Sequence, residues 1–569
     1  MARVPLADVQ PFPVPLMTGG TVTTDDGNIQ TQFAVNLKLR QISTDQKPGT
    51  PTDHGGLTQW VSSSATGEST RGGIVWNGVK YRVQGSSVYA YAADGTRTKI
   101  GTVANDGLRC RLDYSFDFLL IVSAGNLYYY SPTGFSHATS LSFASGGSGY
   151  NVGDTITLGP LGIYATLTVT GVSGGVLTSV SITNAPQVQT KFVPTNPVPQ
   201  VLSSGGGTGA SFNATWTSLG NFVQVDLARS TNITPVVDAA FMAGYVMVTD
   251  GMSVYNSHLV NPLYFPGYFG SAEYDPDGIS YIYKLNNQLY IGGKNTHQTM
   301  QNTGGNNFPF TVQQSYTFDI GCVSRQTMCY FNRTLAWIGN GRNMPVGVWM
   351  LNGNAPNKIS SAGVDRELAK LTQDQIGVVT LEAISFEDSE LLYVHLPTKT
   401  LVFDAIATVA VGVKFWTQLN SGAHDTDFYR ARDLIMFNGT WTCGDLADNR
   451  VGILDSTTGG HYGEPVLHQS TGPMAMLPLA SAGLRSIELK CITGQSGDTS
   501  RIGMQYSSDG IRWSQIRFTS AVPRGAYDRR IRWLPAGLAR DRMQIRISHV
   551  TTQHVTWFGA LIELEPLAT

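Results

Sequence analysis

Several groups of residues in this 569-residue chain have side chains that could do chemistry. The Gly-rich runs 146–154 and 203–209 could cradle a phosphate, but neither is followed by Gly-Lys-Ser/Thr or lies between a strand and a helix. His424 and Asp425 are adjacent, yet no Gly-x-Ser-x-Gly elbow supplies a nucleophile for them. Asp275 and Asp277 could bind calcium, but the further ligands and the terminal Glu of a calcium loop are missing. We therefore expect turns at the Gly-rich runs and at 274–278, and no catalytic triad.

The segment 507–513, Ser-Ser-Asp-Gly-Ile-Arg-Trp, resembles the Asp-box of sialidases, which are β-propeller proteins. It has one clear copy, and it lacks the residue that normally separates the Asp from the Gly. In sialidases the box is itself a structural hairpin, and we can assign no counterpart to the Arg triad and the Tyr/Glu pair of their active site. The resemblance predicts a turn. We predict no catalytic residue, no metal site and no cofactor, and a protein that is not an enzyme.

The C-terminal segment is locally basic. From Ser481 to the end there are twelve Lys and Arg against seven Asp and Glu, a balance of about +5, whereas the whole chain has a formal net charge of −2. Because the chain as a whole lacks a basic excess, we expect any contact with DNA to be weak or local. Two interpretations stay open: outward strand positions paired with local acids, or a surface that faces a second subunit or phosphate. The candidate interface or DNA-facing residues are Arg512, Arg517, Arg524, Arg529, Arg530, Arg532, Arg540, Arg542 and Arg546.

Composition places the chain among turn-rich β-proteins. Charged residues make up 14%, against about 25% in ordinary soluble proteins, and there are 63 glycines and 10% aromatics. This balance fits surfaces committed to neighbours and equally a low-charge secreted β-protein. The five cysteines are odd in number and widely spaced, which predicts buried thiols in a protein assembled in reducing cytoplasm. The start of the chain lacks a signal-peptide h-region and apolar runs such as 118–122 are too short to span a bilayer, so we expect no export signal and no membrane anchor.

Short β-rich runs recur at roughly 40 to 55 residues, the spacing of propeller blades, for example at 79–91, 116–130 and 328–339. Turn residues that tolerate positive φ separate the two strands of such runs, at 124–126, 249–251, 285–287, 331–333 and 437–439. A closed ring of blades would also remove the exposed edges of a large open sheet. One helix is expected at 365–376, with Asp365 as its N-cap.

The predicted fold is all-β: a six- or seven-bladed β-propeller with an inserted small β-domain and a C-terminal β-sandwich. The inserted segment is Gly/Ser/Thr-rich, nearly free of charge and alternating in pattern, and we expect it to lie between blades. The predicted domains are an N-terminal extended arm at 1–60, the first blades at 61–141, the inserted domain at 142–216, the remaining blades at 217–473 and the sandwich at 474–569.

The second half of the chain contains segments whose order and spacing match a known family. They begin with 381–397, Leu-Glu-Ala-Ile-Ser-Phe-Glu-Asp-Ser-Glu-Leu-Leu-Tyr-Val-His-Leu-Pro, and continue at 401–404, 415–416, 427–430, 442–445 and 451–455. This part resembles the packaged-DNA stabilisation proteins of P22-like short-tailed bacteriophages. The predicted helix lies where that family has a helical stretch, and weaker similarity extends to 35–37 and to the terminal sandwich. The segment 142–216 departs from the family pattern and looks like a lineage-specific insertion.

The resemblance implies a structural protein of the virion tail, assembled in the cytoplasm of the host bacterium. It implies a homo-hexameric nozzle or hub below the portal and the head-to-tail adaptor protein, in contact with a tail needle or tip protein and with tailspikes or tail fibres. Packaged double-stranded DNA would pass through its lumen, be retained at a closed tip and leave during genome ejection. Rigid blades, low charge and many aromatics suit such a ring, and a near-neutral wall lets DNA slide. The alternative function is a receptor- or glycan-binding propeller protein of a tail fibre.

Overall fold

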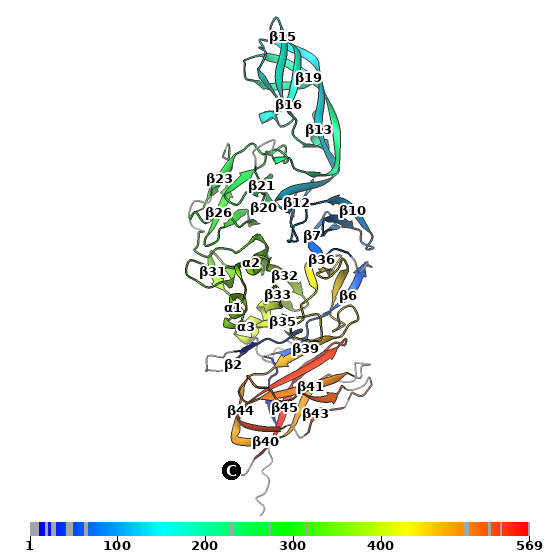
Figure 1. Ribbon diagram of the computed structural model, residues 1–569, viewed down its shortest axis with the longest axis vertical. Coiled ribbons are helices and arrows are strands. Elements are labelled where there is room, and N and C mark those ends of the chain that lie inside the picture. The colour runs from blue at the N-terminus through cyan, green and yellow to red at the C-terminus, as the bar shows by residue number, and fades with distance from the viewer. Residues whose placement is uncertain are drawn as a thin grey trace, which may run out of the picture. The chain divides into compact units, whose positions relative to one another are not determined.

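The computed structural model describes residues 11–17, 21–23, 30–40, 49–61, 67–227, 233–271, 275–305, 307–313, 317–492, 500–521, 525–527, 529–534 and 537–566. Most of these residues lie in antiparallel β-strands (Figure 1). The chain divides into two compact units. The first unit holds Met1–Ser69, Gln326–Ile338 and Pro345–Thr569, and the second holds Thr70–Arg325 and Gly339–Met344. The prediction of an all-β protein is confirmed.

The second unit contains four-stranded antiparallel sheets, the size of propeller blades. Apolar side chains of neighbouring sheets share a core, in which Val83 and Val88 of one sheet pack with Leu119 and Ile121 of the next. The separate sheets are β7 (Thr70–Trp76), β8 (Val79–Gln84), β9 (Ser87–Tyr91) and β10 (Arg97–Thr102); β20 (Asp238–Met242), β21 (Tyr245–Thr249), β22 (Ser253–Asn256) and β23 (Phe269–Ser271); and β24 (Tyr281–Leu285), β25 (Gln288–Gly292), β26 (His297–Asn302) and β27 (Phe310–Val312).

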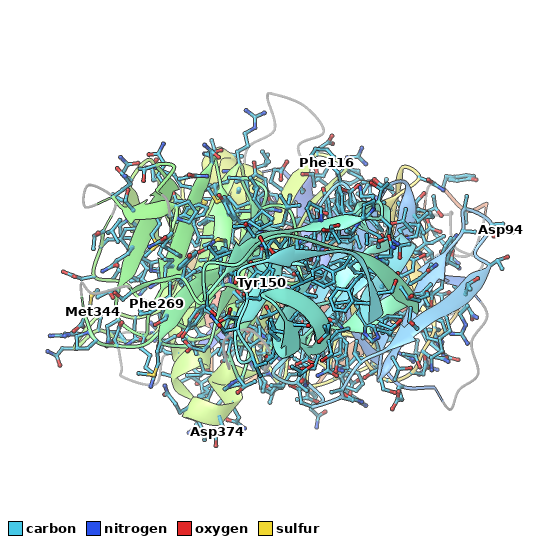
Figure 2. The ribbon with its side chains drawn as sticks, turned by 90° about the horizontal axis from the view of Figure 1, so that it is seen from above. Asp94, Phe116, Tyr150, Phe269, Met344 and Asp374 are labelled. Atoms are coloured by element: carbon cyan, nitrogen blue, oxygen red, sulfur yellow. The ribbon has the colours of Figure 1, made fainter. Side chains whose placement is uncertain are left out.

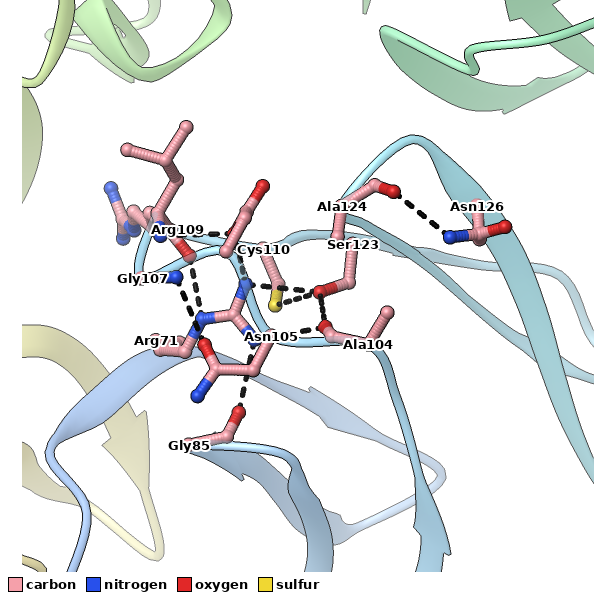
Figure 3. A network of polar contacts seen from close by, with 12 residues as sticks. Arg71, Gly85, Ala104, Asn105, Gly107, Arg109, Cys110, Ser123, Ala124 and Asn126 are labelled. Atoms are coloured by element: carbon pink, nitrogen blue, oxygen red, sulfur yellow. Dashed lines mark hydrogen bonds and ion pairs between the residues drawn. The ribbon is translucent and has the colours of Figure 1, made fainter.

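A buried arginine ties the first of these sheets to its neighbour (Figure 3). Arg71, which is 4% exposed, forms an ion pair with Asp106 at 2.5 Å. Its guanidinium also donates to the carbonyl oxygens of Leu108 at 2.7 Å, Gly85 at 3.0 Å and Ala104 at 3.2 Å. A further bond reaches the hydroxyl of Ser123 at 3.0 Å, in the strand β12 (Leu119–Ser123). Each nitrogen of the buried cation therefore has an acceptor, as burial of a charge requires.

The first unit repeats the same four-stranded pattern and uses the N-terminal segment to complete it. The strand β6 (Gly56–Val61) pairs antiparallel with β38, with Gln59 opposite Gly452, so the start of the chain supplies the outer strand of the last sheet. The sheets are β28 (Met328–Phe331), β29 (Thr334–Gly339), β30 (Gly347–Asn352) and β31 (Ala355–Lys358); β32 (Thr380–Phe386), β33 (Ser389–His395), β34 (Thr400–Asp404) and β35 (Trp416–Leu419); and β36 (Ala431–Phe437), β37 (Thr440–Asp445), β38 (Val451–Asp455) and β6.

Tight hairpin turns lie where the sequence predicts them. A two-residue hairpin turn of type I′ has positive φ at both central positions, which Asn and Gly adopt at least cost. Four of the predicted turns have this geometry, at Ala124 and Gly125 (φ 47° and 76°), Asn286 and Asn287 (49° and 60°), Asn332 and Arg333 (47° and 63°), and Asn438 and Gly439 (50° and 76°). In the fifth turn only Gly251 has positive φ, at 96°, and the Asp250 carboxylate accepts from the backbone N–H groups of Met252 and Ser253.

The inserted domain continues from two strands of one blade. It does not lie between two blades, so the prediction from the sequence is wrong on this point. Two long strands, β13 (Asn126–Ser148) and β19 (Thr208–Gln224), belong to the blade of β11 (Arg111–Tyr114) and β12 and continue into the insertion. The two strands pair along this length, with a register shift between Tyr130 and Phe135. The insertion adds β14 (Thr155–Leu158), β15 (Ala165–Ser173), β16 (Val176–Asn184), β17 (Val188–Gln189) and β18 (Val198–Ser203). Tyr150 (Figure 2) is buried in its apolar core.

The single predicted helix is two short helices. α1 (Ala362–Ala369) begins after Ser361, whose hydroxyl accepts from the backbone N–H of Val364, so Ser361 and not Asp365 is the N-cap. α2 (Gln373–Gly377) has a capping box of Thr372 and Gln375. A third helix, α3 (Ala405–Val411), was not predicted; Asp404 caps its start and Gly412, at φ 79°, ends it.

The predicted C-terminal β-sandwich is confirmed. Its strands are β39 (Val466–Thr471), β40 (Ala475–Cys491), β41 (Arg501–Ser507), β42 (Arg517–Ser520), β43 (Ile531–Trp533), β44 (Gly537–Thr551) and β45 (Trp557–Pro566). The N-terminal strand β1 (Phe12–Val14) joins it by pairing with β45. Val14, Leu16 and Met17 are buried in the sandwich core, so side chains of the N-terminal segment contribute to it.

The rest of the described N-terminal segment is hydrogen-bonded to other parts of the first unit. It contains β2 (Thr21–Thr23), β3 (Gln30–Gln32), β4 (Leu37–Arg40) and β5 (Thr50–Asp53). Asn36, at φ 53°, donates to the side chain of Asn420 at 2.7 Å and to the carbonyl of Leu467 at 2.8 Å. Its own side-chain oxygen accepts from the backbone N–H of Asn420 at 3.0 Å. One buried amide thus joins the arm to the end of β35 and to β39.

The five cysteines are free thiols, and Cys110, Cys322 and Cys443 are buried. Burial raises the pKa of the Cys491 thiol to about 12. Within the described part of the chain, no helix has the length and apolar character needed to cross a membrane.

Candidate interaction surface

The Asp-box-like segment of the sandwich is a turn built around one carboxylate. Asp509 accepts hydrogen bonds from the backbone N–H groups of Ile511 at 2.8 Å and Arg512 at 2.7 Å, and from the hydroxyl of Ser507 at 2.9 Å. These hydrogen bonds lower the pKa of Asp509, and the bond from the Arg512 N–H has the largest effect. Gly510 takes φ 74° at the tip. The carboxylate therefore holds the loop in shape, as the sequence predicts for this segment.

The residues that follow this turn present apolar side chains beside arginines. We call residues 511–518 the sandwich strip; it reads Ile-Arg-Trp-Ser-Gln-Ile-Arg-Phe. Ile511 is 38% exposed, Ile516 41% and Phe518 55%. Arg512 and Arg517 between them are exposed. Aromatic, aliphatic and Arg side chains in this mixture are typical of the cores of protein interfaces.

Arg546 packs against Trp513 at the centre of the sandwich strip. Its guanidinium lies over the Trp513 ring, 3.8 Å from the ring centre. The same group donates to the side-chain oxygen of Gln32 in β3 at 2.8 Å and to the Thr471 hydroxyl at 3.4 Å. Burial lowers the pKa of Arg546 to about 10, and the charge of Asp425 opposes that shift. Arg546 therefore acts as a packing residue that orients Trp513.

Two of the predicted arginines pair with acids of the sandwich. Arg532 approaches Glu488 at 3.6 Å and Glu563 at 3.0 Å, and it donates to Ser486 at 3.0 Å. Arg530 lies 3.8 Å from the same Glu488. Since Glu488 also pairs with Lys490, this carboxylate is shared among Lys490 of β40, Arg532 of its neighbour β43 and Arg530 just before β43.

The remaining arginines divide into exposed and undescribed positions. Arg529 and Arg542 are exposed, and Arg542 lies in β44 opposite Met476 of β40. Arg540 also lies in β44. Arg524 lies outside the described residues. The sequence singled out the arginines but missed Trp513, Ile516 and Phe518, although the apolar residues interleaved with Arg512 and Arg517 could have drawn attention to them.

The acidic pair considered for calcium serves a turn. Asp277 accepts from the backbone N–H groups of Asn295 at 2.6 Å and Thr296 at 3.1 Å, and Asp275 pairs with Arg342. A cleft of about 670 Å³ opens beside these residues. In the described ranges no cluster of three or more His, Cys, Asp or Glu side chains could hold a metal.

His424 and Asp425 also lie in a turn. The His424 backbone N–H donates to Asp427 at 2.8 Å, and the carbonyl oxygens of His424 and Asp425 accept from Asn420 and Gln418 at 2.6 Å each.

Comparison with known proteins gives a consistent family. The chain matches the family model described as the β-propeller of bacteriophage P22 Gp10 over residues 12–159 and 161–459, and the one described as its β-sandwich over residues 471–565. It is similar to the tail hub protein gp10 of Salmonella phage P22, with 24% identity over 297 residues, 52% of this chain. That match covers 62% of the P22 protein, which is less than two thirds of its length.

Solved structures resemble the chain only distantly. A computationally designed protein, Ika8, covers 70% of this chain and 99% of its own, with 8% identity and a TM-score of 0.31. Virginiamycin B lyase from Staphylococcus aureus covers 70% and 98%, with 10% identity and a TM-score of 0.36. With TM-scores this low, no conclusion about function follows from them.

The two family models together extend over most of the chain, in the order of its propeller sheets and its sandwich. The chain therefore belongs to the bacteriophage P22 Gp10 family.

Proposed function

We propose that this protein is a structural subunit of the tail of a short-tailed bacteriophage, a tail hub or nozzle. The observation that carries the proposal is the match to both the propeller and the sandwich of P22 Gp10, together with the name of the similar P22 protein, a tail hub. In this role the chain belongs to the virion, and its assembly takes place in the host cytoplasm.

The proposed assembly is a ring of six copies. It lies below the portal and the head-to-tail adaptor protein, continues the DNA channel, and contacts a tail needle or tip protein and the tailspikes or tail fibres. A low charged fraction of 14% and 10% aromatics support large contacts between neighbours. The blades support rigid walls, because a four-stranded sheet with a shared core resists bending.

The proposed mechanism is steric retention of packaged DNA, released when the closed tip rearranges at the host surface. A channel wall should not grip phosphate, and several cations of the sheets are already paired with acids. Lys284 lies 2.7 Å from Asp113, and Arg430 lies 2.9 Å from Asp445. A chain with a net charge of −2 gains little free energy from counterion release, so DNA can slide along it.

Electron microscopy of the purified full-length protein, alone and mixed with its adaptor, tests the assembly. We expect sixfold rings that stack on the adaptor. A trimeric fibre-like particle, or a monomer that cleaves or binds polysaccharide, would refute the hub and support the fibre alternative.

A further inference from the structure

We propose that the sandwich strip, residues 511–518, docks on the propeller part of a neighbouring copy of this chain. The inference rests on the proposed ring and names the surface that would close it. It depends on three observations: the composition of the sandwich strip, its rigidity and the division of charge along the chain.

The sandwich strip has the composition of an interface core while it is still exposed. Phe518 is 55% exposed and Ile516 41%, with exposed arginines at 512 and 517. Ile516 covers Gly503 of β41, where a side chain would collide with it at 2.5 Å. Gly503 therefore leaves room for the Ile516 side chain over β41.

The sandwich strip is also pre-organised, which reduces the entropy lost on docking. The turn before it is held by Asp509, and Trp513 is held by Arg546. Ser514 pairs with Tyr506 of β41: its backbone N–H donates to the Tyr506 carbonyl at 2.9 Å, and its hydroxyl accepts from the Tyr506 N–H at 3.1 Å. Rigid aromatic and Arg side chains are the residues that most often dominate binding energy.

The division of charge selects the partner. Twelve of the 38 Lys and Arg residues and seven of the 40 Asp and Glu residues lie from Ser481 onward, so this segment carries +5 and the rest of the chain −7. Within the sandwich, Glu488, Glu563 and Asp509 are already engaged by its own donors. Two sandwiches would therefore repel each other, whereas a sandwich and the remainder of another copy attract. Such a head-to-tail contact joins different surfaces of identical chains, which is the kind of contact that closes a ring.

Packaged DNA fits the sandwich strip less well. Phosphate recognition calls for clustered cations and backbone donors, whereas here apolar side chains alternate with the two arginines. A surface that gripped phosphate would also impede the sliding that ejection needs. DNA binding is therefore the competing outcome of the test.

Assembly of the full-length protein should be measured by mass photometry over a range of concentrations and salt. We expect Phe518→Asp and Arg512→Glu to raise the dissociation constant of the ring at least tenfold. We expect Arg542→Glu, an exposed arginine of the same sandwich outside the sandwich strip, to change it less than twofold. Thermal unfolding of each variant controls for folding, and Phe518 and Arg512 are exposed enough for the fold to persist. Hydrogen exchange of peptides spanning 501–520 should slow on assembly of the wild-type protein.

Rings that form equally well with Phe518→Asp and Arg512→Glu would overturn this inference and leave the proposed hub intact. Rings that form normally while Arg512→Glu loses salt-dependent binding of double-stranded DNA would assign the sandwich strip to DNA instead. A wild-type protein that stays monomeric, with or without its adaptor, would refute both the sandwich strip contact and the proposed hub.

Discussion

Removing the buried guanidinium of Arg71 should loosen the first blade sheet of the second unit. Arg71→Ala leaves the Asp106 carboxylate and the carbonyls of Gly85, Leu108 and Ala104 without this donor. Breaking a buried, hydrogen-bonded charge pair costs about 3–5 kcal/mol. Asp106 is 30% exposed, so water can replace part of the lost interaction, and we expect a cost near the lower end, about 3 kcal/mol.

Hydrogen exchange followed by mass spectrometry measures this cost locally, since a chain of two units does not unfold in one step. A loss of about 3 kcal/mol corresponds to exchange roughly 100-fold faster in peptides that cover 70–123. Arg71→Lys keeps the charge but loses the planar fork of donors, and should give about half the effect on the free energy. The matched control, Asp106→Asn, keeps an acceptor and should cost about 1 kcal/mol. Exchange within fivefold of wild type in Arg71→Ala would show that the cation does not hold this sheet.

Three further changes test other parts of the fold. Burial lowers the pKa values of His54 and His461 to about 3, so on acidification the unfolded chain takes up protons before the folded chain does. Between pH 7 and pH 5 each histidine should therefore lower the free energy of unfolding of the first unit by about 2 kcal/mol. A free energy of unfolding that stays constant over this range would contradict the expectation. Gly412→Ala places a side chain at φ 79°, with nothing close enough to clash with it. Thermal melting of the first unit should therefore show a loss of stability of about 1 kcal/mol, which comes from the backbone conformation alone. Leu167→Ala, in the fully buried core of the insertion, should cost about 2–5 kcal/mol and speed proteolysis of the insertion; equal proteolysis of wild type and variant would refute this.

Turns could be predicted from the sequence because their conformation depends on a few neighbouring residues. The Asn-Asn, Asn-Arg and Asn-Gly pairs at 286–287, 332–333 and 438–439 adopt positive φ because few other conformations join two twisted strands so tightly. The Asp-box-like turn at Asp509 follows in the same way from a short side chain that bonds its own backbone.

Long-range pairing escaped prediction, because alternation along one strand does not identify its partner. Nothing near Gln59 indicates that it pairs opposite Gly452. The sequences of β13 and β19 look like separate short runs, which favours a place for the insertion between blades. The charged residue that ties two sheets together, Arg71, resembles a surface arginine until its five contacts are seen.

The candidate surface was predicted only in part, since charge is visible in a sequence and burial is not. The nine arginines stood out as a basic cluster, but their roles depend on which acids lie across the sheet. Arg532 lies opposite Glu488, and Arg546 is covered by Trp513 and Gln32, so neither is a free surface charge.

Retention of packaged DNA is the central claim, and phage particles made without this protein test it most directly. Particles from a host infected with a phage that carries a nonsense mutation in this gene should be purified and treated with nuclease. The amount of protected genome per capsid should then be compared with that of wild-type virions. We predict heads that package DNA and then lose it, with little protected genome, and rescue when the wild-type protein is added back. Stable, nuclease-resistant, DNA-filled heads without the protein would contradict a role in retention.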